Sequence, residues 1–425
     1  MKISRQRDIF LGGCWKPHPF LLKIGACFSQ NGPFMKILIA FFVLLLTVLF
    51  AGPLDRYGRR RFGFSLRTVS GLEFVLLGIL FSQVGLNIFT EKVILQLFPI
   101  ISFSLGWLGF LVTIDFDIRI LRKVGIRSVL FAVILAFLIF ISVSGGFYLL
   151  NRWYPIFTHL EMPWLLGVLA VATSPLLLRH MAQKFRVRPA QMKTLLFLTA
   201  FGGVLGIFVY GAMADFLKIT PWWRNLLLDA SLGLGSGLLL NVLVSARRTH
   251  NEMLLFVYGT IFLSSGLAGL LGLSPLFVNA IAGAVVANSS VRRYRIAAIL
   301  SEAEQLILVL ILVTFGALWS ISPGEWKSLA VPIVGIGVGF FLLRLLGRWL
   351  GAKMIGALFK TDVTSLSGAL LCQVSILVAL LIDFRLFFPS LIELHKLFVG
   401  LTLAMFLSVW PAYRLMDRYL KELTS

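Results

Sequence analysis

The sequence predicts an all-α polytopic membrane protein, because long apolar runs fill most of the chain and basic residues concentrate between them. Hydrophobic residues make up 59% of the 425 positions and charged residues 13%, about half the charged share of a soluble globular protein. A helix satisfies its own backbone groups in lipid, and about 20 apolar residues cross the hydrocarbon core. We therefore expect the chain to fold in the bilayer, with no large soluble domain.

The apolar runs predict about thirteen transmembrane helices. They cover residues 35–51, 70–88, 93–113, 128–150, 162–180, 192–216, 225–245, 253–271, 275–288, 298–320, 328–350, 364–384 and 394–415. The connections between these runs are short, so residues 35–425 are expected to form a single membrane domain.

The loop charges predict the orientation of the chain. Every odd-numbered span is followed by a loop richer in Lys and Arg, such as Arg119–Arg127 after the third span. Lys92 is the only Lys or Arg in the loop after the second span, and Arg152 is the only one in the loop after the fourth. Because cytoplasmic loops collect basic residues, the N-terminus is expected outside and the C-terminus in the cytoplasm of a multi-pass cell-membrane protein. An aromatic belt on the outer side fits the same orientation. Its members would be Trp153, Trp222, Trp223, Trp319 and Trp326.

Residues 1–34 do not fit this orientation, because they carry five basic residues on the expected outer side. Met35-Lys36 followed by an apolar run is typical of a natural beginning. We therefore expect residues 1–34 to be disordered or non-native. The run from Ile37 could also be a cleaved signal peptide, but the arginine-rich segment after it would then have to cross the membrane, which favours a retained first helix.

Several function classes are not expected. The net charge of +21 comes from basic loops, which argues against nucleic-acid binding. Three scattered cysteines and five histidines show no metal-ligand spacing, so no metal or cofactor is expected. No phosphate-binding glycine-rich motif and no nucleophile–base constellation is found, which argues against an ATP-driven pump and against an enzyme.

Five segments in order resemble the cation–proton antiporter superfamily, which includes sodium–proton exchangers and potassium-efflux antiporters. They are Gly71–Phe81, Gly106–Lys123, Ala172–Pro175, Gly266–Asn288 and Arg344–Gly347. The resemblance implies two inverted repeats, here about residues 70–216 and 253–415, with an ion site where two discontinuous helices cross.

The first discontinuous helix would break at Thr173, Ser174 and Pro175, because proline removes a backbone donor inside an apolar span. Its counterpart in the second repeat would contain Gln373 and Ser375. An ordinary proline kink with interhelical hydrogen bonds is the alternative interpretation. Unpaired backbone in lipid is tolerated only beside protein or a water-filled cavity, which favours the crossing.

One departure from the family bears directly on function. The segment Thr199–Gly203 is similar to the position where the family carries an acidic pair, and Gly202 and Gly203 replace both acids. No Asp or Glu lies between Met162 and Gly211. A neutral site cannot exchange a proton for a cation by titration, and we expect the two glycines to leave uncharged space there.

Charged residues near the expected crossing are few. Arg344 lies inside an apolar run and is expected to point into the crossing, although a long side chain can also extend to the headgroups. Free carbonyls of the break, or Glu302, would then accept its hydrogen bonds. Glu302 and Glu304 are secondary candidates, with solvation or a local salt bridge as the alternative. The acids at span ends are expected to be solvated. They are Asp115, Asp117 and Asp215.

Two hypotheses for function follow. The first is a secondary transporter that exchanges a small ion or solute for protons, with carboxylate coupling unlike that of the family. The second is a transport-inactive relative that serves as a structural or regulatory subunit of a membrane complex. The expected partners are the lipid bilayer, a small ion or solute and a second copy of the chain.

Overall fold

In the computed structural model every regular element of the described residues is a helix. The structure describes residues 42, 44–47, 71–82, 85–86, 88–118, 126–159, 161–173, 189–218, 221–245, 249–319, 326–359, 374–388 and 394–424. The helices are α4 (Leu72–Phe81), α5 (Glu91–Gln96), α6 (Phe98–Ile114), α8 (Ile126–Trp153), α9 (Met162–Val171), α11 (Pro189–Leu217), α12 (Trp222–Ser245), α13 (His250–Leu271), α14 (Pro275–Ser289), α15 (Arg293–Ala317), α16 (Trp326–Phe359), α18 (Val374–Phe387) and α19 (Leu394–Thr424).

These helices follow the expected spans. Six of the described helices are long and apolar enough to cross a membrane, and shorter apolar helices accompany them. Each expected span from 70–88 onward overlaps at least one helix. The expected span 93–113 is divided at Leu97 into α5 and α6, because Pro99 in the first turn of α6 has no amide N–H with which to continue the hydrogen bonding of α5. Residues 1–34 and most of the first span lie outside the described residues.

The bundle has a buried centre and an apolar exterior. In α18 every residue from Val374 to Phe384 is buried. By contrast, 28% of the apolar stretch of α12 is buried, and large side chains such as Val242, 69% exposed, point outward. A helix that is apolar all round belongs in the middle of a bundle, and an exposed apolar face is typical of contact with lipid.

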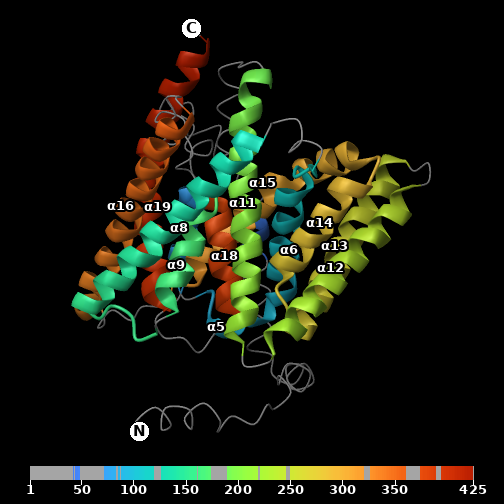
Figure 1. The fold of residues 1–425 in the computed structure, drawn as a ribbon. Coiled ribbons are helices and arrows are strands. Elements are labelled where there is room, and N and C mark those ends of the chain that lie inside the picture. Colours follow the sequence, from blue (N-terminus) through green and yellow to red (C-terminus); the bar gives the residue numbers. More distant parts are fainter. Residues whose placement is uncertain are drawn as a thin grey trace, which may run out of the picture.

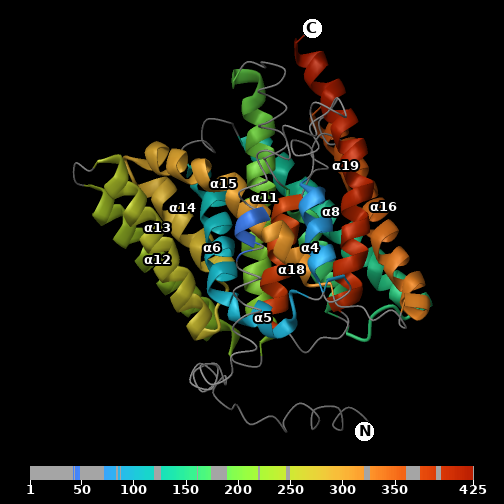
Figure 2. The ribbon, with the colours of Figure 1, turned by 180° about the vertical axis from the view of Figure 1, so that it is seen from behind.

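Figure 1 shows how the helices are arranged around this centre. The helices α12 and α13 form one edge of the bundle and α16 and α19 the other, with α6, α11 and α18 between them. Seen from behind, α4 and α15 lie across the middle (Figure 2). The helix α14 packs most extensively on α6 and α12, and α16 on α8 and α19. The short helices α9 and α18 both contact α11, which brings their ends together at the centre.

Candidate functional site

A helix ends at the centre of the bundle, and we call this end, at Ala172–Thr173, the break. The helix α9 ends at Val171, and Ala172 already has an extended backbone with ψ of 127°. Thr173 follows in non-helical conformation and is 4% exposed. The helix α9 therefore ends at the start of the segment in which the sequence predicts a break, while Ser174 and Pro175 lie outside the described residues.

The broken end of α9 rests on α11. The Thr173 hydroxyl donates a hydrogen bond of 2.8 Å to the main-chain oxygen of Thr199. A methyl group built on Gly202 would collide with the same hydroxyl. On Gly206, one turn further along α11, it would lie 2.9 Å from the Cβ atom of Ala172. The structure thus brings three of the candidate residues, Thr173, Thr199 and Gly202, into direct proximity.

Gly203 lies where α6, α9, α11 and α18 meet. A methyl group there would lie 2.8 Å from the carbonyl oxygen of Thr173, 2.9 Å from the side chain of Ile376 and 3.4 Å from Val112. The expectation that the glycines leave open space is therefore wrong at this position. The backbone of the break occupies the volume that a side chain on Gly203 would need, because only glycine allows such a close approach.

The α18 side of this junction is apolar and tightly packed. Ser375 is 6% exposed and lies in the first turn of α18, next to Ile376. Gln373, the other candidate from this segment, lies outside the described residues.

Arg344 reaches the broken helix from α16. Its side chain is 2% exposed, and its Nε atom donates a hydrogen bond of 3.1 Å to the carbonyl oxygen of Ala170. That carbonyl belongs to the last turn of α9, whose final carbonyls have no partner within the helix. A cation is also favourable at the negative end of the helix dipole. Arg344 therefore caps α9 and does not extend to the headgroups. Arg348, one turn later in α16, is 1% exposed. It is not among the site residues predicted from the sequence.

Glu302 on α15 lies away from the end of α9 and from Arg344. The Glu302 side chain is 57% exposed and lies 3.9 Å from the exposed His250. The expectation that Glu302 supplies an acceptor or an acid at the crossing is therefore wrong. Glu304 is half-buried on the same helix.

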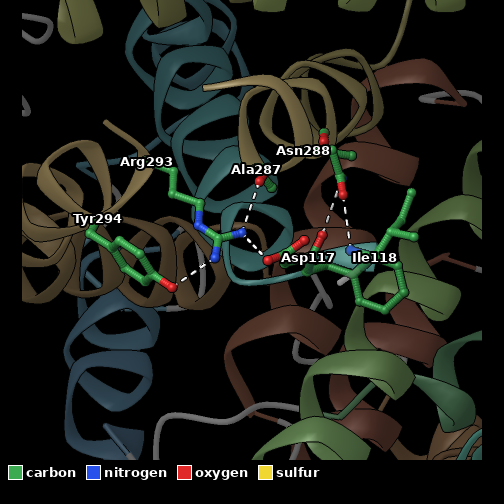
Figure 3. Close-up of polar contacts among 8 residues, drawn as sticks. Asp117, Ile118, Ala287, Asn288, Arg293 and Tyr294 are labelled. Carbon is green, nitrogen blue, oxygen red and sulfur yellow. Dashed lines mark hydrogen bonds and ion pairs between the residues drawn. The ribbon is translucent and has the colours of Figure 1, made fainter. Parts of the chain in front are cut away.

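A polar cluster ties the end of α6 to the turn between α14 and α15 (Figure 3). Asp117, whose side chain is 3% exposed, forms an ion pair with Arg293 at the start of α15. Arg293 also donates hydrogen bonds of 3.1 Å to the carbonyl oxygen of Ala287 and 2.7 Å to the Tyr294 hydroxyl. The expectation that Asp117 is solvated is wrong, because α6 packs along α14 and carries the carboxylate under the arginine.

Asn288 at the end of α14 completes this cluster. Its side-chain oxygen accepts a hydrogen bond of 2.9 Å from the amide of Ile118, and its amide group donates 2.7 Å to Ala284 and 3.4 Å to Phe116. We call Asp117, Asn288 and Arg293 the corner cluster. Its contacts fix the relative position of α6, α14 and α15.

Two buried acids are not among the candidates predicted from the sequence, and a third is buried where solvation was expected. Asp229 in α12 and Asp383 in α18 are 0% exposed, and Asp215 in α11 is 2% exposed rather than solvated. A signal was present, since Asp229 and Asp383 each interrupt an apolar run, and charges within spans are functional candidates by default. Among the residues that the structure describes, no group of three His, Cys, Asp or Glu is placed to hold a metal ion.

Comparison with solved structures shows the fold. The chain is similar to the sodium–proton antiporter MjNhaP1 of Methanocaldococcus jannaschii, with a TM-score of 0.65 and 18% identity over 91% of this chain and 98% of that one. A second structure of the same antiporter, from an electron-microscopy map, gives a TM-score of 0.61 at 18% identity, covering 91% of this chain and 97% of that one. No protein-family model matches the chain. No curated protein matches its sequence.

Proposed function

We propose that this chain is a secondary membrane transporter that exchanges a small ion or solute for protons. The observation that carries the proposal is the break at Ala172–Thr173, held at the centre of the bundle by α11 and by Arg344. Discontinuous helices in transporters of this architecture surround the substrate site. The likeness to an antiporter structure over nearly the whole chain supports the same assignment.

The transported solute follows from the charges at the break. A sodium or potassium ion would meet the fixed charge of Arg344 and two glycines where an acid would be needed. Cation binding is therefore weak, and an anionic or neutral solute fits better. Inverted repeats, about thirteen spans, a cytoplasmic C-terminus in the cell membrane and a homodimer belong to the same proposal.

The test uses the purified full chain in liposomes that contain a pH-sensitive dye and carry a pH gradient. Sodium gluconate, potassium gluconate and choline chloride are added in turn. Proton movement with choline chloride but not with the two gluconate salts is the expected result. Saturable exchange driven by sodium or potassium gluconate would overturn the assignment of an anionic or neutral solute.

A gain-of-function variant sharpens this test. Gly202 is the better position for an added acid, because a side chain there meets the rotatable hydroxyl of Thr173, whereas on Gly203 it meets a backbone carbonyl. We expect Gly202→Asp to acquire exchange with sodium or potassium gluconate, and Gly202→Asn, which has the same shape without the charge, to lack it.

The close packing at Gly203 favours a second candidate function, a transport-inactive subunit of a membrane complex. A break filled by its own backbone holds helices together without an ion site. No proton movement with any of the three salts, together with recovery of a stable partner protein on mild solubilisation of native membranes, would support this candidate over the first.

A further inference from the structure

The turn between α14 and α15 contains an open hollow with basic and apolar walls. It has a volume of about 360 Å³ and is lined by Val291, Arg292, Tyr294 and Arg295, which we call the turn hollow. Small-ligand sites in proteins have volumes of about 300–1,000 Å³, so a ligand of modest size fits here. Val291 is 96% exposed and Tyr294 73% exposed, so both present apolar surface that nothing in the described chain covers.

The corner cluster holds one wall of the turn hollow in place. Arg293 donates a hydrogen bond of 2.7 Å to the Tyr294 hydroxyl, and its guanidinium lies 4.6 Å from the centre of the Tyr294 ring (Figure 3). The charge of Arg293 is balanced by its ion pair with Asp117. Arg293 therefore positions the tyrosine ring, and the charge of the hollow comes from Arg292 and Arg295.

The positive charge of the turn hollow is not balanced at Arg295. Within the part of the chain that the structure describes, no carboxylate lies within ion-pair distance of the Arg295 guanidinium. Glu302, about two turns along α15, lies beside His250 instead. The start of a helix also carries a partial positive charge, so basic residues there are unfavourable unless an anion lies near them. The turn hollow thus favours an anionic ligand.

The position of the turn hollow favours a lipid as the source of that anion. The ion pair of Asp117 with Arg293 places the turn at the end of α6, where the basic segment Arg119–Arg127 begins. Basic loops of this kind lie at the membrane surface, at the level of the phospholipid phosphates. A lipid would also cover Val291 and Tyr294 with its glycerol backbone and upper acyl chains, because tyrosine rings lie at headgroup level. A water-soluble anion would leave both side chains exposed.

We propose that the turn hollow binds the headgroup of an anionic phospholipid such as phosphatidylglycerol. Arg292 and Arg295 hold the phosphate, because guanidinium groups match phosphate geometry with paired hydrogen bonds. Since Arg293 joins the wall of the hollow to the corner cluster, a bound lipid stabilises the junction of α6, α14 and α15. The proposal is independent of what the chain transports.

The test follows the melting temperature of the purified full chain in a non-ionic detergent. Dioctanoyl phosphatidylglycerol, dioctanoyl phosphatidylcholine and inorganic phosphate are titrated separately. A ligand that binds only the folded protein raises the melting temperature in a concentration-dependent way, which gives an apparent Kd. We expect a saturable rise with phosphatidylglycerol, a smaller rise with phosphatidylcholine and none with inorganic phosphate at the same concentrations.

Substitutions locate the binding site. The double variant Arg292→Gln/Arg295→Gln should raise the apparent Kd for phosphatidylglycerol on the order of 30-fold, because each basic residue at an anionic lipid surface contributes about fivefold. The matched control is Arg152→Gln/Arg224→Gln, which removes two exposed arginines on the expected outer side and should leave the Kd unchanged. Arg295→Gln alone should raise the Kd about fivefold, whereas Arg295→Lys, which keeps the charge, should have a smaller effect.

Three outcomes would overturn the proposal. Equal stabilisation by phosphatidylglycerol and phosphatidylcholine, or by neither, would show that the hollow does not select an anionic lipid. Equal stabilisation by inorganic phosphate would show that it recognises a free anion. An unchanged Kd in Arg292→Gln/Arg295→Gln, or the same loss in Arg152→Gln/Arg224→Gln, would place lipid binding elsewhere. Arg295→Gln, which leaves Arg292 and the corner cluster intact, keeps the test valid if the double variant does not fold.

Discussion

At Gly203 the distance from an added methyl group to the carbonyl oxygen of Thr173 would be 2.8 Å, shorter than a carbon–oxygen contact allows. The neighbour is backbone, which cannot rotate away as the Thr173 hydroxyl beside Gly202 can. The glycine is therefore a packing requirement of the break as well as the loss of an acid. Glycine at position 203 carries no charge where the resembling family has an acid, and its lack of a side chain lets α9 approach α11.

A substitution series tests this close approach. Gly203→Ala should lower the melting temperature of the detergent-solubilised protein, with a cost on the order of 1–3 kcal/mol for overpacking. The matched control is Gly235→Ala in α12, where nothing lies within 4 Å of the added methyl group. That change should be neutral or stabilising by about 0.5–1 kcal/mol, because alanine is the better helix former. Equal melting temperatures for the two variants would mean that the break does not press on Gly203.

Arg344, like Gly203, affects both the packing and the charge at the end of α9. Its hydrogen bond to Ala170 occupies a carbonyl at the end of α9 that an uninterrupted helix would have used itself. The arginine thus stabilises the break and at the same time places a positive charge beside it. The positive charge disfavours a second cation at this position.

At the scale of elements, the broken helix and the corner cluster have complementary roles. The break sets the end of α9 against α11 at the centre, and the corner cluster fixes α6 against the turn between α14 and α15 (Figure 3). The helices α6 and α14 also pack closely along their length. We expect these two helices to stay together in any movement of the bundle.

A double-mutant cycle measures the corner cluster. Asp117→Asn and Arg293→Gln should each lower the melting temperature, because loss of one partner from a buried ion pair costs about 3–5 kcal/mol, and less where the pair reaches solvent as Arg293 does here. The double variant should lose less stability than the sum of the two single variants.

Glu302→Gln is the control for this cycle. It disrupts an exposed pair on the same helix, with side-chain exposures of 60% and 57%, and should change stability by less than about 1 kcal/mol. Strict additivity of the two corner substitutions would show that Asp117 and Arg293 act independently.

At the scale of the whole molecule, burial separates the helices into centre and periphery. The helix α18 is enclosed on all sides, and α12 and α16 each bury 28% of their apolar stretch. The side chains of the buried acids Asp215, Asp229 and Asp383 face away from the apolar exterior.

The orientation of the molecule is a prediction of its loop charges. Reporter fusions at Ser425 and at Ser322 should report the cytoplasm and the exterior respectively, since the two sites flank an odd number of expected spans. The measurement is the activity of a reporter that functions on one side of the membrane. If both sites report the same compartment, the expected number of spans between them is wrong.

Neighbours along the chain suffice to predict the helices and the end of α9. Apolar runs, loop charges and Pro175 act over a few residues, so spans such as 128–150 and 253–271 and the end of α9 near Thr173 could be predicted from neighbours along the chain. The type and order of elements therefore needed no knowledge of packing.

Which distant side chains meet depends on how the helices pack against one another. The burial of Asp117 depends on Arg293, and the hydrogen bonds to Asp383 in α18 come from Tyr210 in α11 and from Ser274 before α14. Whether Gly203 leaves a cavity depends on the backbone at Thr173. In each case the free energy of a polar or small residue is set by atoms from another helix, and no local pattern in the sequence contains those atoms.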